Sequence, residues 1–95
     1  MNLQINAVSK KDGGGYYAYF DDGEIVLRPT EKKDLLEIVW LSIDNKEKRK
    51  SGLGEKVLKE ISYLLNGVKL RPWSIKEDAM PFWKKMEQRG LCIIH

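Results

Sequence analysis

The stretch Arg49-Lys50-Ser51-Gly52-Leu53-Gly54 decides the fold, because it joins the most apolar segment of the chain to its clearest helical pattern. The segment before it, 35–43, contains β-branched and aromatic residues that favour a central strand, although the absence of strict alternation leaves a helix possible. After it, apolar residues from Leu53 to Leu65 recur at the spacing of one helix face. Two glycines before a helix leave backbone N–H groups accessible at its positive end. The stretch therefore predicts a socket for a phosphate or pyrophosphate, with a plain tight turn as the alternative.

Upstream of this stretch the sequence predicts a series of short strands. Residues 3–8 place apolar side chains at every second position, and residues 16–20 are rich in aromatic side chains. Glycine-containing turns at 11–15 and 21–23 separate these segments from a third strand at 24–28. Together with the apolar segment before the glycines, these strands predict a mostly antiparallel sheet.

Downstream, the sequence predicts a β-α-β unit. The first helix ends at the helix-stopping pair Asn66-Gly67, and short strands are predicted at 68–73 and 91–94 on either side of a second helix. The predicted order is β-β-β-β-α-β-α-β. It indicates one α+β domain over residues 1–95, without internal repeats or linkers.

The start of the second helix carries two conflicting signals. Ser74 and Glu77 have the spacing of a capping box, which would begin a helix at once. Pro81 does not suit a helix interior, so the helix either begins late, near Met80, or is kinked. It is expected to end near Gly90.

Composition limits the classes of function. The chain has 95 residues, of which 42% are hydrophobic and 33% charged, as expected of one compact domain. No apolar run approaches the roughly 20 residues that cross a membrane, and no secretory signal is recognised, so we expect a cytoplasmic location and no membrane partner. Cys92 and His95 are the only cysteine and histidine, which disfavours a metal site and a catalytic Ser-His or Cys-His pair.

The net charge of +3 permits an anionic ligand but does not require nucleic acid, which we regard as an unlikely partner. Basic residues crowd into 46–50, and they form either a rim for phosphate groups or a solvated loop.

The glycine stretch resembles a known motif. Arg49 to Gly54 match the Arg/Gln-x-x-Gly-x-Gly/Ala pyrophosphate loop of the GNAT acetyltransferase superfamily. Residues 37–43 resemble the fourth strand of that fold, and 78–86 are similar to its Ala-x-x-Phe-Tyr-x-Lys segment. The resemblance implies a minimal GNAT fold, in which a mixed, mostly antiparallel sheet packs against two helices and a splayed pair of strands holds acetyl-CoA.

This resemblance implies acetyl-CoA as a co-substrate and a primary amine as acceptor. Backbone N–H groups at Lys50 to Glu55 would hold the pyrophosphate, and backbone groups at 41–43 would pair with the pantetheine as a strand does. The residues implied to contact acetyl-CoA are Leu41, Ser42, Ile43, Arg49, Lys50, Ser51, Gly52, Leu53, Gly54, Glu55, Ser74 and Phe82.

Glu37 is the candidate general base, because it resembles the strand-four glutamate of the protein-lysine acetyltransferase branch. Among apolar neighbours its pKa would be raised by desolvation, as suits a base. The alternative is a solvated Glu37 or one paired with a lysine. The general acid is not identified: the usual tyrosine position resembles Trp83, and Ser74, Tyr63, a water molecule or unassisted thiolate departure remain as alternatives.

Two further features bear on the acceptor. Residues 85–90 are longer than the usual ending of the family segment, and only 9–15 connect the first two strands, where most members carry two helices. An uncovered acceptor groove suits a protein lysine better than a small metabolite. The rival hypothesis is a non-catalytic or CoA-bound GNAT-like module that binds a protein partner or nucleic acid through its basic loop.

Overall fold

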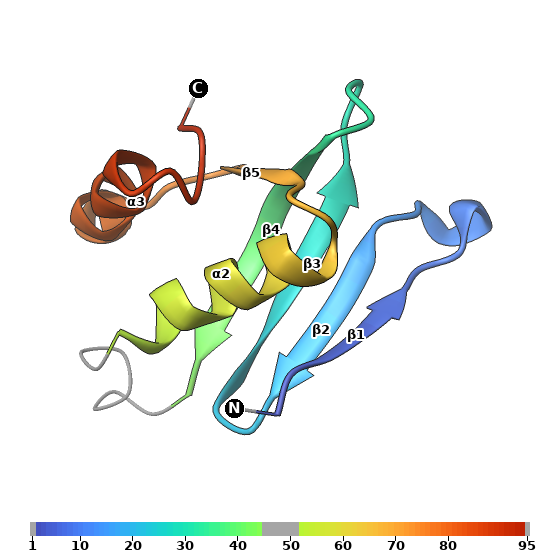
Figure 1. The fold of residues 1–95 in the computed structure, drawn as a ribbon, viewed down its shortest axis with the longest axis horizontal. Helices are drawn as coiled ribbons and strands as arrows, with labels where there is room; N and C mark the ends of the chain where they lie inside the picture. Colours follow the sequence, from blue (N-terminus) through green and yellow to red (C-terminus); the bar gives the residue numbers. More distant parts are fainter. Residues whose placement is uncertain (1, 45–51, 95) are drawn as a thin grey trace.

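A computed structural model describes residues 2–44 and 52–94, with five strands in one sheet and two α-helices (Figure 1). The strand order is β1-β2-β3-β4-β5; the first four strands pair antiparallel in sequence order, and β5 pairs parallel with β4. This confirms the α+β class and the mixed, mostly antiparallel sheet. The strands are β1 (Gln4–Ala7), β2 (Tyr16–Phe20), β3 (Gly23–Pro29), β4 (Leu35–Ile43) and β5 (Lys69–Pro72).

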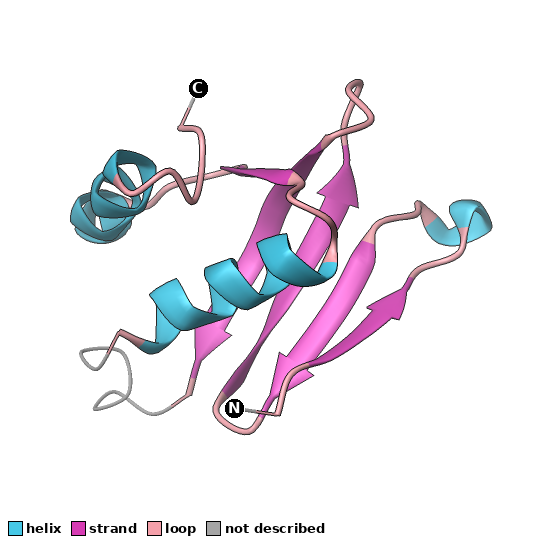
Figure 2. Cartoon of the chain, viewed as in Figure 1, coloured by secondary structure: helices cyan, strands magenta, loops and turns pink. Residues whose placement is uncertain are grey.

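The helices lie where a parallel strand pair requires them. Parallel strands need a crossover connection, and α2 (Leu53–Leu64) supplies it between β4 and β5. The helix α3 (Met80–Gln88) follows β5 and begins at Met80, which is the late start that Pro81 left open as one of two alternatives. Figure 2 shows α2 lying across one face of the sheet and α3 lying beyond β5. Two short 3-10 turns, η1 (Lys10–Asp12) and η2 (Glu77–Ala79), complete the described elements.

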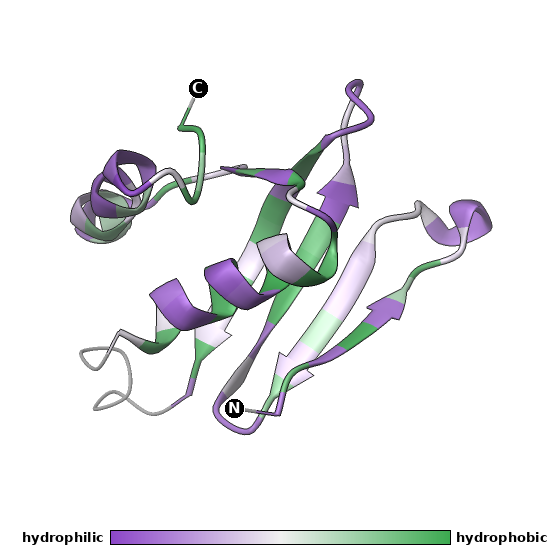
Figure 3. Ribbon diagram, in the orientation of Figure 1, coloured by the Kyte–Doolittle hydropathy of each residue, from purple (hydrophilic) through white to green (hydrophobic). Residues whose placement is uncertain are grey.

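The core lies between α2 and the sheet face that it covers, which we call the helix-covered face. Figure 3 shows apolar strand segments beneath this helix. The helix contributes Val57, Leu58 and Ile61, each fully buried, and the strands contribute Ile25 and Leu27, at most 2% exposed. Burying side chains of this size stabilises the fold by roughly 1.5–3 kcal/mol each, so the apolar spacing of α2 is what fixes it on the sheet.

Two local predictions are wrong. Residues 91–94 form no strand; they leave the C-terminus of α3 through left-handed Gly90, and the Ile93 N–H donates one bond to Leu70 O at 2.8 Å. The Ile94 N–H donates instead to a Glu87 carboxylate oxygen at 3.1 Å, so this segment is bonded to both β5 and α3 and extends neither a ladder nor a helix. The predicted capping box is also absent: Ser74 lies in a bend, and η2 begins after Lys76 without a side-chain cap.

Candidate functional site

The β4 strand separates from β5 at a defined point. The parallel ladder joins Leu35–Ile38 of β4 to β5 and ends at the pair Ile38–Pro72, after which the Trp73 N–H still donates to Ile38 O at 3.0 Å. The β4 strand continues to Ile43, paired with β3 alone among the described strands. Beyond Ile38, alternate residues such as Leu41 therefore turn their backbone groups away from β3, on the side that the β5 ladder no longer reaches.

A β-bulge accompanies this separation. On β3, Val26 and Leu27 are consecutive, but their partners on β4 are Trp40 and Ile38, so Val39 is the extra residue. A bulge bends its strand and increases the local twist, which accounts for the end of the β5 ladder one residue earlier. The bulge also resets the alternation, so that Leu41 and Ile43 return to the helix-covered face.

The first turn of α2 lies close to the end of β4. Gly52 is the N-cap residue with φ +82°, and it has no side chain with which to cap the helix. A Cβ at Gly52 would meet no atom of residues 2–44 or 54–94 within 4 Å, so those residues leave the space beside this backbone open, and its left-handed conformation is what favours glycine. Open space beside an uncapped helix start fits the anionic end of a nucleotide-like ligand.

Gly54 has a different role from Gly52. A Cβ there would lie 2.9 Å from Phe82 Cζ and 3.7 Å from Ile43 Cδ1, so this glycine lets the Phe82 ring pack against the first turn of α2. The structure thus brings together Ile43, Gly54 and Phe82 from three elements, and Leu53 is buried beside them in the core. Arg49, Lys50 and Ser51, which were predicted to contact the same ligand, lie outside the described residues.

Glu55 also lies in the first turn of α2, where its carboxylate pairs with Lys59 at 3.2 Å and with Arg89, the C-cap residue of α3. Desolvation raises the pKa of this carboxyl, but the hydrogen bond to Lys59 and the charges of both basic groups together lower it. The ionised carboxylate is thereby held by two cations beside the helix start.

Glu37 lies at the centre of an ionic row across three strands. It accepts from Arg28 on β3 at 2.7 Å and from Arg71 on β5 at 3.1 Å. The hydrogen bond from Arg28, with the bond and charge of Arg71, lowers the pKa of Glu37 despite some desolvation. The predicted rise in its pKa is therefore wrong, because the neighbouring strands place guanidinium groups where apolar side chains were expected.

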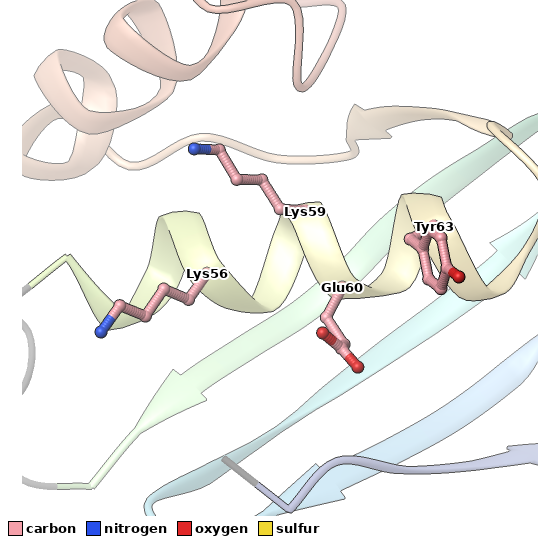
Figure 4. Close-up of a pocket in the computed structure, with 4 residues that line it drawn as sticks. All are labelled: Lys56, Lys59, Glu60 and Tyr63. Atoms are coloured by element: carbon pink, nitrogen blue, oxygen red, sulfur yellow. The ribbon is translucent and has the colours of Figure 1, made fainter.

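The residue at the usual tyrosine position, Trp83, and the two side chains considered as alternative acids, Ser74 and Tyr63, belong to three different parts of the fold. Trp83 is buried in α3, Ser74 is exposed in the bend after β5, and Tyr63 is 79% exposed on the outer side of α2. Figure 4 shows Tyr63 on the outer side of α2, in a hollow that it lines with Lys56, Lys59 and Glu60. All four come from one helix, and this hollow includes none of the residues around the end of β4.

The sheet face opposite α2, which we call the open face, carries exposed aromatic side chains. Tyr17 and Tyr19 of β2, Trp40 of β4 and Trp73 after β5 are 38–58% exposed. Strand alternation could have placed the tyrosines here, because Ala18 and Phe20 are the buried members of β2. The position of Trp40 on this face could not be predicted without the bulge. That of Trp73 could not be predicted without its contact with Arg28, whose Cζ lies 5.2 Å from the ring centroid.

No family model matches the sequence, no curated protein is significantly similar to it, and no solved structure matches the fold. Within residues 2–44 and 52–94, no helix is both long and apolar enough to span a membrane. The same residues bring no three histidine, cysteine or acidic side chains together as a metal site. The site is therefore interpreted from its own geometry.

Proposed function

We propose that this chain binds acetyl-CoA between β4 and β5 and transfers the acetyl group to a primary amine, with a lysine on a protein as the acceptor. One observation carries the proposal: β4 extends beyond the end of the parallel ladder at Ile38, next to a bulge, and ends beside an uncapped helix start at Gly52. This combination supports the minimal GNAT fold that the motif at Arg49 to Gly54 implies.

The β4 edge offers what the pantetheine arm of CoA needs. That arm contains two amides, each with one donor and one acceptor, and an extended backbone edge pairs with such groups as it would with a strand. Leu41 would provide such backbone groups, because alternate residues of a strand face the same edge and Ser42, like Asp44 two residues later, faces β3. The Leu41 side chain lies on the helix-covered face and so leaves this edge clear.

The pyrophosphate would lie against the N-terminus of α2. Backbone N–H groups there have no intrahelical partners, and the positive end of the helix dipole favours the anion. Gly52 leaves open space for this approach, and the Phe82 ring closes the apolar side next to Gly54.

The acceptor would enter on the open face, where Glu37 lies one residue before the last β4–β5 pair. We propose Glu37 as the carboxylate that receives the ammonium proton before the nitrogen attacks the thioester carbonyl. The lowered pKa makes Glu37 a weak base, but it keeps the carboxylate ionised and ready to accept this proton over a wide pH range. As the tetrahedral intermediate collapses, the nitrogen gives its second proton to water, and the CoA thiolate leaves and takes a proton from water.

A pair of substitutions at Gly52 tests the donor site. Gly52→Ala and Gly52→Glu strain the same left-handed backbone equally, but only the second adds a carboxylate. At roughly 5 Å and an effective dielectric of about 20, one unit charge repels another by about 3 kcal/mol, or more than about 100-fold in affinity. Calorimetric titration with acetyl-CoA should show near wild-type binding for Gly52→Ala and no binding for Gly52→Glu. Equal affinity in the two variants would remove the helix start from the site.

A test of transfer uses a different residue. Glu37→Gln should keep acetyl-CoA affinity and slow acetylation of a lysine-containing acceptor by roughly 100-fold, the scale of a general base. Arg28→Gln is the matched control, since it breaks the same ionic row and leaves the carboxylate in place. An unchanged rate in Glu37→Gln would exclude Glu37 from the chemistry.

A second candidate function is a binding module without transfer. The observations that favour it are the aromatic open face and the two arginines that hold Glu37. Acetyl-CoA binding with no transfer to any amine, together with capture of a partner by the open face, would favour this alternative.

A further inference from the structure

The open face combines features that the donor site does not use. Its four exposed rings belong to Tyr17, Tyr19, Trp40 and Trp73. Together they expose about as much as two complete aromatic side chains, which bury roughly 150–250 Å² each. Four rings alone thus supply about half of the roughly 800 Å² per partner that a standard protein interface buries. Tyrosine, tryptophan and arginine are also the residue types that dominate binding energy at such interfaces.

Three of the four rings, those of Tyr17, Tyr19 and Trp40, lie close together across the sheet and form what we call the aromatic centre. Tyr17 lies opposite Val26, and Val26 lies opposite Trp40, so one cross-strand row joins β2, β3 and β4. Tyr19 is next to Tyr17 on the same face, with ring centroids 6.1 Å apart. Tyr17 is anchored by a 2.7 Å hydrogen bond from its hydroxyl to Glu24, which raises the pKa of that hydroxyl. Tyr17 is thus held in place before any partner arrives, and Tyr19 packs beside it.

Charge is distributed unevenly about this aromatic centre. One end of the sheet contains the β2–β3 turn, and the charged side chains described in this turn and the adjoining strand ends are all acidic. Asp44 belongs to this end, because its N–H donates to Asp22 O at 2.6 Å. These acidic residues are Asp21, Asp22, Glu24 and Asp44. At the opposite end, which includes η1 and the β3–β4 loop, basic residues outnumber acidic ones, although Arg71 pairs there with both Glu31 and Glu37. The basic residues are Lys10, Lys11, Arg28, Lys32, Lys33, Lys69 and Arg71, and the acidic ones are Asp12, Glu31, Asp34 and Glu37.

We infer that the open face binds the open face of a second copy of this chain. A two-fold axis through the aromatic centre would place the acidic end of one copy over the basic end of the other, so the charges are self-complementary along the strands. Two sheets packed face to face in this way form an ordinary aligned sandwich. A polyanion such as single-stranded nucleic acid would have to cover the acidic end, which makes it the less favoured occupant.

This inference goes beyond the proposed transfer reaction and does not depend on it. It also links the two, because Glu37 and Trp73 lie on the open face. A protein acceptor and the second copy would compete for this face, and acceptor binding would shift the equilibrium toward the monomer.

Sedimentation velocity of the full chain, without CoA or acceptor, tests the inference. We expect a dimer with a dissociation constant in the micromolar range or below, as interfaces of this size give. Trp40→Glu should weaken the dimer by at least about 30-fold, since a central tryptophan is typically a binding hot spot. The matched control is Tyr63→Glu on the outer side of α2, where the same change should have no effect. A monomer at about 100 μM would overturn the inference.

Charge exchange gives a second test that does not depend on a buried ring. Asp21→Lys and Lys69→Glu lie at opposite ends of the face, and both side chains are exposed. Each alone should weaken the dimer about tenfold at low salt, and the two together should restore it. If the double variant dimerises more weakly than either single variant, the two-fold arrangement is refuted. A monomeric chain whose open face instead binds a labelled oligonucleotide, with loss in Trp40→Glu, would refute the second copy as the occupant.

Discussion

Substitution of Gly54 tests how the first turn of α2 is packed. An added Cβ would lie 2.9 Å from Phe82 Cζ and 3.0 Å from Phe82 Cε1, closer than such contacts normally come. The Phe82 ring has little freedom to move away, because it packs edge to face against buried Trp83 with centroids 5.0 Å apart.

Two effects of opposite sign decide the magnitude. Replacing glycine with alanine inside a helix stabilises it by up to about 1 kcal/mol, whereas overpacking costs about 1–3 kcal/mol. We expect a net loss of about 1 kcal/mol for Gly54→Ala and of about 3 kcal/mol for the bulkier Gly54→Val. Phe82→Leu removes the ring atoms that clash, so in that background Gly54→Ala should be neutral or stabilising.

Urea unfolding followed by circular dichroism gives the free energy of unfolding of the wild type, Gly54→Ala, Phe82→Leu and the double variant, which together form a double-mutant cycle. A coupling free energy of about 1 kcal/mol or more between the two positions is the expected result. Stabilisation by Gly54→Ala in the wild-type background would show that the ring does not occupy this place. Acetyl-CoA affinity should change little in Gly54→Ala, because the Gly54 position serves packing and Gly52 leaves the open space.

Three further predictions concern titration and reactivity. Acetyl transfer to a lysine side chain should change little with pH between about 6 and 8, because the lowered pKa of Glu37 leaves it ionised and able to take the proton of the bound ammonium throughout. In Glu37→Gln the residual rate should instead rise at slope one towards the acceptor pKa of about 10.4; a slope of one in the wild-type chain would contradict this. The pKa of Glu37 is lower in the folded chain than in the unfolded chain, so the ionised carboxylate stabilises the fold above the unfolded-state pKa, and this contribution is lost as pH falls through the folded-state pKa. Wild type and Glu37→Gln should therefore unfold at more similar urea concentrations at acid pH than at pH 7. Burial, with the charge of Glu87, raises the pKa of Cys92 to about 11 from 9.0. A thiol reagent at pH 8 should therefore label Cys92 only after unfolding, and the stability that the protonated thiol contributes should be lost between pH 9 and 11. Rapid labelling of the native protein would refute the burial of Cys92.

The sequence predicted most of the sheet because its signals are local. The alternation in β2 and the apolar run of β4 matched the strands observed at Tyr16–Phe20 and Leu35–Ile43. The apolar spacing of α2 predicted its buried side. Residues 91–94 failed because their β-branched composition favours a strand, whereas hydrogen bonds to Leu70 and Glu87 decide their path.

The site was less accessible to sequence reasoning, because its properties depend on neighbouring strands. The pKa of Glu37 is set by Arg28 and Arg71, which are nine and 34 residues away in the chain. The exposure of Trp40 depends on the bulge at Val39, which no composition signal marks. Gly52 and Gly54 are equivalent in the sequence motif, and only the structure distinguishes them. Gly54 is packed against the Phe82 ring, whereas Gly52 lies beside open space.

The central claim is that the end of β4 and the start of α2 together bind acetyl-CoA. Calorimetric titration of the full chain with acetyl-CoA tests it most directly. The account predicts saturable binding of one acetyl-CoA per chain, with much weaker binding of acetyl-pantetheine, which lacks the pyrophosphate. Absence of heat at millimolar acetyl-CoA, or equal affinity for both compounds, would contradict it.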